Sequence, residues 1–253
     1  MNFLHFIRAS AKIILLQALL LSVSVMHAFC GNGASAYKDS THSTKIKKAK
    51  PIIMGNYLQV FYPLDNTAEY SITICADLPD NSNPKCVYKK GEPGHVFLVL
   101  SKQNNVTPEA VVIRSFGFYP RLPVTCLIKQ VRSEILDNSD REYDVSLEKK
   151  LSKEEFALLL EKCIEFSKKK YNLKRYNCYE YVMEVFNSLP GIETLPVSKV
   201  KFPFIFGRGG SPCGLYGDLK KLLLSGSSWV PYIKFGTFKS PALDRSQNLI
   251  ANF

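Results

Sequence analysis

The hydrophobic pattern of this 253-residue chain changes its period once, near residue 151. Before that point, short apolar segments rich in aromatic and β-branched residues alternate with polar turns, which is typical of β-strands. After it, apolar residues recur at spacings of three and four, which is typical of amphipathic helices. A run of strands followed by a run of helices predicts an α+β domain rather than an alternating parallel sheet.

The boundaries of these elements follow from local signals. The first helix begins at the capping box that Ser152 forms with Glu155, and its apolar stripe runs through Cys163. The second covers residues 178–188 and stops at Pro190, and a third, short helix covers residues 215–224. The expected strands are residues 57–62, 70–75, 95–100, 111–118, 124–131 and, closing the sheet, 229–235.

Residues 1–36 have the features of an export signal. Arg8 and Lys12 precede an uncharged apolar run over residues 13–26, and small residues then offer cleavage after Ala28 or Ala36. The run is shorter than the roughly 20 apolar residues that span a bilayer. An uncleaved anchor and a lipoprotein signal at Cys30 are the alternatives. We expect a secreted or periplasmic protein in which residues 51–253 form one domain.

The formal net charge of +11 is unevenly distributed. Residues 1–36 hold +2 and residues 37–50 hold +4, which leaves +5 for residues 51–253. A nucleic-acid-binding protein concentrates basic residues on its folded domain, so we expect no nucleic-acid partner. We interpret residues 37–50 as a basic flexible linker that contacts the cell envelope. The sequence does not indicate an oligomeric state.

Two positions interrupt the local patterns with chemically reactive groups. A glycine-rich turn, residues 91–94, delivers His95 to the first position of an apolar strand. Asn177 is a good helix N-cap, which places Cys178 in the first turn, where the helix dipole favours a thiolate. A neighbouring imidazole completes a nucleophile–base pair, and backbone N–H groups at the helix start suit an oxyanion. Taken singly, a structural histidine and a core cysteine are the simpler interpretations.

These motifs, in their order along the chain, resemble the circularly permuted branch of the NlpC-like, papain-fold cysteine peptidases. The resemblance spans roughly residues 91–220 and is carried by the following segments: Gly94-His95-Val96-Phe97-Leu98, Ser115-Phe116-Gly117-Phe118-Tyr119-Pro120, Tyr171-Asn172-Leu173, Asn177-Cys178, Gly210-Ser211-Pro212-Cys213-Gly214-Leu215 and Asp218-Leu219. It implies a papain-like antiparallel sheet packed on the cysteine helix. It also implies thiol-dependent amide hydrolysis with Cys178 as nucleophile and His95 as base.

A third catalytic residue is less defined. If the loop near Asn104 centres the hairpin after His95, then Ser115 lies opposite His95 and orients its ring, with Tyr119 as the alternative. Asn177 is a candidate oxyanion donor, although capping alone explains its presence. Both Ser115 and Tyr119 also suit ordinary strand positions.

The remaining cysteines indicate a disulfide, and the motifs that are missing argue against a metal or cofactor site. Cys75 and Cys86 flank a turn-rich loop and form a candidate disulfide in an oxidising compartment. No C-x-x-C pair or glycine-rich phosphate loop is present, so we expect neither a metal nor a cofactor. The resemblance implies a peptide, peptidoglycan or acyl substrate. An acyltransferase or lipid hydrolase on the same fold, and a non-catalytic envelope-binding module, are the competing hypotheses.

Overall fold

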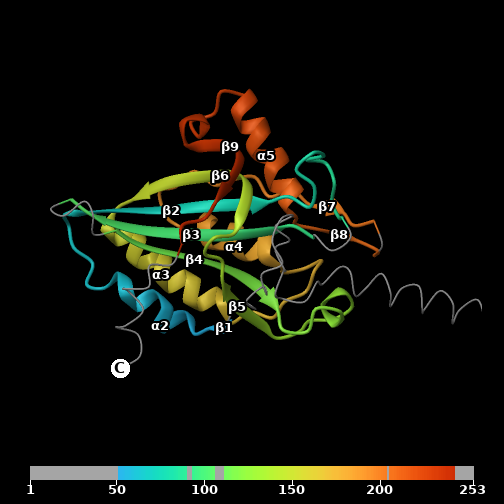
Figure 1. The fold of residues 1–253 in the computed structure, drawn as a ribbon, viewed down its shortest axis with the longest axis horizontal. Coiled ribbons are helices and arrows are strands. Elements are labelled where there is room, and N and C mark those ends of the chain that lie inside the picture. The colour runs from blue at the N-terminus through green and yellow to red at the C-terminus, as the bar shows by residue number, and fades with distance from the viewer. Residues whose placement is uncertain (1–50, 90–92, 106–110, 204, 243–253) are drawn as a thin grey trace, which may run out of the picture.

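In a computed structural model, the described part of the chain comprises residues 51–89, 93–105, 111–203 and 205–242 (Figure 1). The expected export signal and linker, residues 1–50, lie outside it, as do Gly91 and Glu92. The described chain is mixed α+β, as its hydrophobic pattern predicts, and all the paired strands are antiparallel.

A seven-stranded antiparallel sheet forms the centre of the fold, with the strand order β1-β5-β4-β3-β2-β6-β9 (Figure 1). Its strands are β1 (Pro51–Ile52), β2 (Ala68–Asp77), β3 (His95–Asn104), β4 (Val111–Pro120), β5 (Ser133–Asp137), β6 (Glu142–Leu151) and β9 (Ile233–Lys239). The short strands β7 (Val200–Lys201) and β8 (Arg208–Gly209) form a separate pair.

The α-helices are α2 (Met54–Leu58), α3 (Lys153–Ser167), α4 (Cys178–Asn187) and α5 (Pro212–Leu224). Single 3-10 turns occupy Gln59–Phe61, Thr125–Leu127 and Val230–Tyr232. Both halves of the expected capping box of α3 are present, since the Ser152 side chain accepts from the Glu155 amide and the Glu155 carboxylate accepts from the Ser152 amide.

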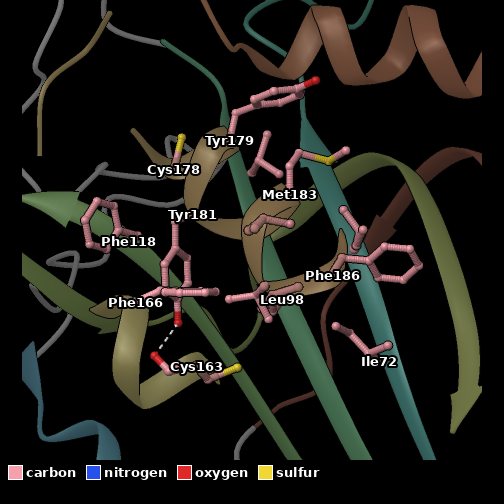
Figure 2. Packing of buried hydrophobic residues seen from close by; sticks show 14 of the residues in the cluster. Ile72, Leu98, Phe118, Cys163, Phe166, Cys178, Tyr179, Tyr181, Met183 and Phe186 are labelled. Carbon is pink, nitrogen blue, oxygen red and sulfur yellow. Dashed lines mark hydrogen bonds between the residues drawn. The ribbon is translucent and has the colours of Figure 1, made fainter. Parts of the chain in front are cut away.

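The main core lies between one face of the sheet and helices α3 and α4. Strand residues alternate between faces, so Ile72 and Leu98 enter this core while Cys75 and Phe97 belong to a smaller cluster on the opposite face. Figure 2 shows Tyr181 of α4 extending into the main core, where its hydroxyl donates to the carbonyl of Cys163 at 3.1 Å. This bond fixes α4 against α3 and thereby positions the first turn of α4.

Two expected strands are wrong. Residues 57–62 belong to α2 and the following 3-10 turn, because Met54, Leu58 and Phe61 are buried at helical spacing. Residues 124–131 lie in a long connection with a single 3-10 turn, in which Ile128 is exposed. Strands β5 and β6 are absent from the sequence-based prediction. Charged residues occupy much of β6, although Val145 and Leu147 alternate into the core.

Among the described helices, none combines the length and the apolar composition that crossing a bilayer requires.

Candidate functional site

Cys178 is the first residue of α4, as the sequence predicts, and its side chain is 8% exposed. The Asn177 side-chain oxygen accepts a hydrogen bond from the Tyr179 amide at 2.7 Å. The Glu180 carboxylate accepts from the Asn177 amide at 3.1 Å, which completes a capping box. Figure 2 shows the Cys178 sulfur pointing away from the core side chains of α4. The thiol therefore lies at the end of the helix, although Cys178 still belongs to the main core cluster.

The side-chain amide of Asn177 is fully occupied by structural contacts. Its nitrogen donates to the carbonyls of Leu173 at 2.8 Å and Gly210 at 3.0 Å. An amide NH₂ group has two donor hydrogens, so none remains for a substrate oxyanion. The structure therefore places Asn177 as the cap that ties α4 to two loops.

His95 is the first residue of β3 and is 4% exposed. The preceding Gly94 has φ of +68°, and a Cβ there would lie 2.6 Å from the carbonyl oxygen of Asp77. Only glycine accommodates this turn, which sets the histidine at the strand end. The imidazole stacks on Tyr119, with ring centroids 4.2 Å apart. Burial lowers the pKa of His95 well below its usual value, and the positive charge of Arg141 lowers the pKa further.

The thiol and the imidazole come from different faces of the sheet, and both lie at the end of the sheet where β3 begins. The His95 side chain projects from the same face as Phe97, whereas α4 covers the opposite face. Pairing between β3 and β4 begins only at Phe97, opposite Gly117, so His95 and Val96 lie beyond the last pair. There the backbone amide of Val96 lies close enough to the Cys178 sulfur to lower the pKa of the thiol.

The protonation of the two groups is set mainly by burial. Burial raises the pKa of the Cys178 thiol to about 11, although the Val96 amide and the charge of Arg141 act in the opposite direction. Because burial also lowers the pKa of His95, both groups are neutral near pH 7 in this state. Such a pair can transfer a proton during attack but does not hold a preformed thiolate and imidazolium.

Gly117 leaves a small space that two unpartnered polar atoms share. A Cβ on Gly117 would lie 2.5 Å from Oδ1 of Asn138 and even closer to Nε2 of His95. Within the described part of the chain, both atoms are buried and lack a hydrogen-bond partner. A hydrogen bond from an Nε2–H donor to the Asn138 oxygen would satisfy both atoms and fix the imidazole. Asn138 is therefore a candidate orienting residue.

The register of the β3–β4 hairpin separates Ser115 from His95. The loop is centred near residue 107 instead of Asn104, so Ser115 lies opposite Val99. Val99 is four residues from His95, or roughly 13 Å along the strand. Tyr119, the alternative candidate, contacts the His95 ring by stacking. Asn138, which directly follows β5, was missed because its strand was missed, and only the turn-type residues 138–140 marked this position in the sequence.

A polar network holds Tyr119 in place. Its hydroxyl oxygen accepts hydrogen bonds from Nδ2 of Asn138 at 2.7 Å and from Nη1 of Arg141 at 3.3 Å. Arg141 also donates to Asp77 at 2.6 Å, and Asp77 lies directly opposite His95 on β2. Arg141 thus pairs with the acid nearest to His95. This leaves Asn138 as the neutral partner on the other side of the imidazole.

The expected disulfide between Cys75 and Cys86 does not form, since both are free thiols. Cys75 faces the small cluster with Phe97. Cys86 instead donates to the carbonyl of Tyr88 at 3.1 Å, and Tyr88 packs against the main core on the other face of the sheet. The two sulfur atoms therefore have different surroundings.

The described residues contain no group of three or more His, Cys, Asp or Glu side chains that could hold a metal ion. No protein-family model matches the chain, and no curated protein or solved structure matches it either.

Proposed function

We propose that this chain is an exported, thiol-dependent hydrolase that cleaves an amide bond in cell-wall peptide or protein, with Cys178 as nucleophile and His95 as base. The observation that carries the proposal is that the backbone amide of Val96, the residue that follows His95, interacts with the Cys178 thiol and lowers its pKa. The position of Cys178 in the first turn of a helix adds to this support. The export assignment rests on residues 1–36 of the sequence.

The fold is consistent with the proposed permuted papain-like arrangement. The histidine strand β3 precedes the cysteine helix α4 in the chain, and α4 packs on the antiparallel sheet. We propose Asn138 as the residue that orients the imidazole, in place of Ser115.

The proposed reaction proceeds by acyl transfer through the sulfur. His95 takes the thiol proton while the sulfur attacks the substrate carbonyl carbon, which becomes a tetrahedral oxyanion. The C–N bond then breaks, His95 returns the proton to the leaving amine, and Cys178 carries a thioester. Water, deprotonated by His95, releases the acid and regenerates the thiol. An acceptor other than water would make the same site an acyltransferase, and an ester substrate would make it a lipid hydrolase.

Mass spectrometry after incubation with a panel of substrates tests this proposal. The panel contains peptidoglycan fragments, an unstructured protein and phospholipid vesicles, and each is incubated with the intact chain and with Cys178→Ala. We expect new cleavage products from at least one substrate and an acyl adduct on Cys178, both absent with the variant. Products that also form with Cys178→Ala would contradict the mechanism, and binding without products or adduct would favour the envelope-binding module.

A further inference from the structure

The net charge of +5 over residues 51–253 conceals a strong local excess of positive charge. Three loops, residues 121–132, 171–177 and 199–210, contain basic residues and no Asp or Glu. Their eight cations are Arg121, Lys129, Arg132, Lys174, Arg175, Lys199, Lys201 and Arg208. The remainder of residues 51–253 consequently has a net charge of −3. We refer to these eight residues and their loops as the basic loop surface.

The three loops lie against one another around the start of α4. The Leu173 amide and the Asn172 side chain both donate to the carbonyl of Cys126, each at 3.1 Å, which joins the first loop to the second. A Cβ on Gly209 would lie 2.8 Å from the carbonyl oxygen of Leu173, which places the third loop against the second. Figure 1 shows the three loops at the same end of the molecule.

No salt bridge among the described residues neutralises the cations of this surface, although the charge of Lys199 acts on the carboxyl of Glu180. Nine salt bridges occur elsewhere in the described part of the chain, and none includes a residue of the basic loop surface. The Arg208 guanidinium instead folds onto the carbonyl of Lys199, with an Nη2–O distance of 2.6 Å, which holds two cations close together. Clustered positive charges without counter-charges create a potential that attracts an anionic surface.

Exposed apolar side chains project from the same loops. Phe206 is 99% exposed, Ile128 is 74% exposed and Leu122 is 58% exposed. Scattered apolar residues are normal on a protein surface, but these three are interspersed with the eight cations. Cations combined with Phe, Leu and Ile are the composition of surfaces that enter the interface of an anionic bilayer. Ile128 and Leu122 have no planar group on which a nucleic-acid base could stack.

We infer that the basic loop surface is a docking site for an anionic phospholipid membrane. The eight cations face the lipid phosphates, and Phe206, Ile128 and Leu122 enter the headgroup region. This inference does not depend on catalysis by Cys178, so it can hold or fail independently of the proposed function.

Vesicle co-sedimentation of the full chain and three variants tests the inference. The first variant is Lys129→Glu with Arg175→Glu, and the second is Phe206→Ser with Ile128→Ser. The control is Lys153→Glu with Lys220→Glu, which makes the same charge change at the first turn of α3 and on α5. Residues 1–50 are identical in all four proteins, so differences between them report on the loops. Circular dichroism establishes that each variant is folded.

We expect the unmodified chain and the control to bind phosphatidylglycerol-containing vesicles more tightly than pure phosphatidylcholine vesicles, and less tightly as salt increases. The loop charge variant should bind these vesicles with at least about tenfold lower affinity. The apolar variant should also bind them more weakly than the unmodified chain. Equal binding by the loop charge variant and the control would overturn the inference. It would also be overturned if the apolar variant bound vesicles normally while the loop charge variant lost affinity for a DNA duplex, because that pattern indicates a nucleic-acid surface.

Discussion

Replacing Cys178 with alanine is expected to lower kcat/KM, on the substrate identified by product analysis, by at least about 10³-fold. The reason is that no other group in the site can form the covalent acyl intermediate. The thiol is small and lies at the end of α4, so its loss should change the thermal midpoint little. Cys178→Ser should lose nearly as much activity, because the serine hydroxyl has a higher pKa than a thiol and the imidazole is not paired with an acid.

Cys213 provides a matched control for this substitution. It also lies in the first turn of a helix, is also 8% exposed, and its sulfur lies 3.0 Å from the Ser211 hydroxyl. It differs from Cys178 in its neighbour: its sulfur contacts the Ser211 hydroxyl, whereas Cys178 lies beside Val96, the residue that follows His95. Cys213→Ala should keep kcat/KM within a few-fold of the unmodified chain. Similar losses of kcat/KM from both substitutions would indicate that each cysteine contributes to the stability of the fold and that neither takes part in the reaction.

Replacing Gly117 with alanine is expected to destabilise the fold by about 1–3 kcal/mol and to remove most of the activity. The added methyl group would overlap Nε2 of His95 and Oδ1 of Asn138, which are both buried. The backbone of Gly117 does not have positive φ, so the cost comes from this overlap rather than from backbone strain. Urea denaturation measures the change in the free energy of unfolding, and the product assay measures the activity.

Gly217 on α5 is the control for this substitution, because a Cβ there meets nothing within 4 Å. Gly217→Ala should stabilise the protein by roughly 0.5–1 kcal/mol through helix propensity, with unchanged activity. A neutral effect of Gly117→Ala on both stability and activity would mean that His95 and Asn138 do not converge on this space. The proposal that Asn138 orients the imidazole would then have no basis.

The sequence predicted the part of the site that depends on local signals. A capping residue followed by an apolar helical stripe places Cys178 in the first turn, and a glycine before an apolar strand places His95 at the strand end. These assignments need only a few neighbouring residues, because caps and turns act within one helical turn or one loop.

The orienting residue could not be predicted in the same way because it depends on strand register. An error of two residues in the centre of the β3–β4 loop changes the residue opposite His95 by four, since each residue of shift in the centre moves the partner by two. Asn138 also reaches His95 across β4 from the end of β5, a strand whose charged and polar residues gave no alternating signal. The basic loop surface could not be predicted from the sequence for a similar reason. The net charge of the domain does not show that basic residues of three separate loops come together in the folded chain.

The central claim is that His95 acts as the base for the Cys178 thiol. The rate at which iodoacetamide alkylates Cys178 near pH 7, in the intact chain and in His95→Gln, tests it most directly. A thiol with a pKa of about 11 is almost entirely protonated at this pH, so attack needs a base to accept its proton. We predict that His95→Gln slows alkylation of Cys178 at least about tenfold and leaves the rate at Cys213 unchanged. Equal rates at Cys178 in the two proteins would contradict the claim.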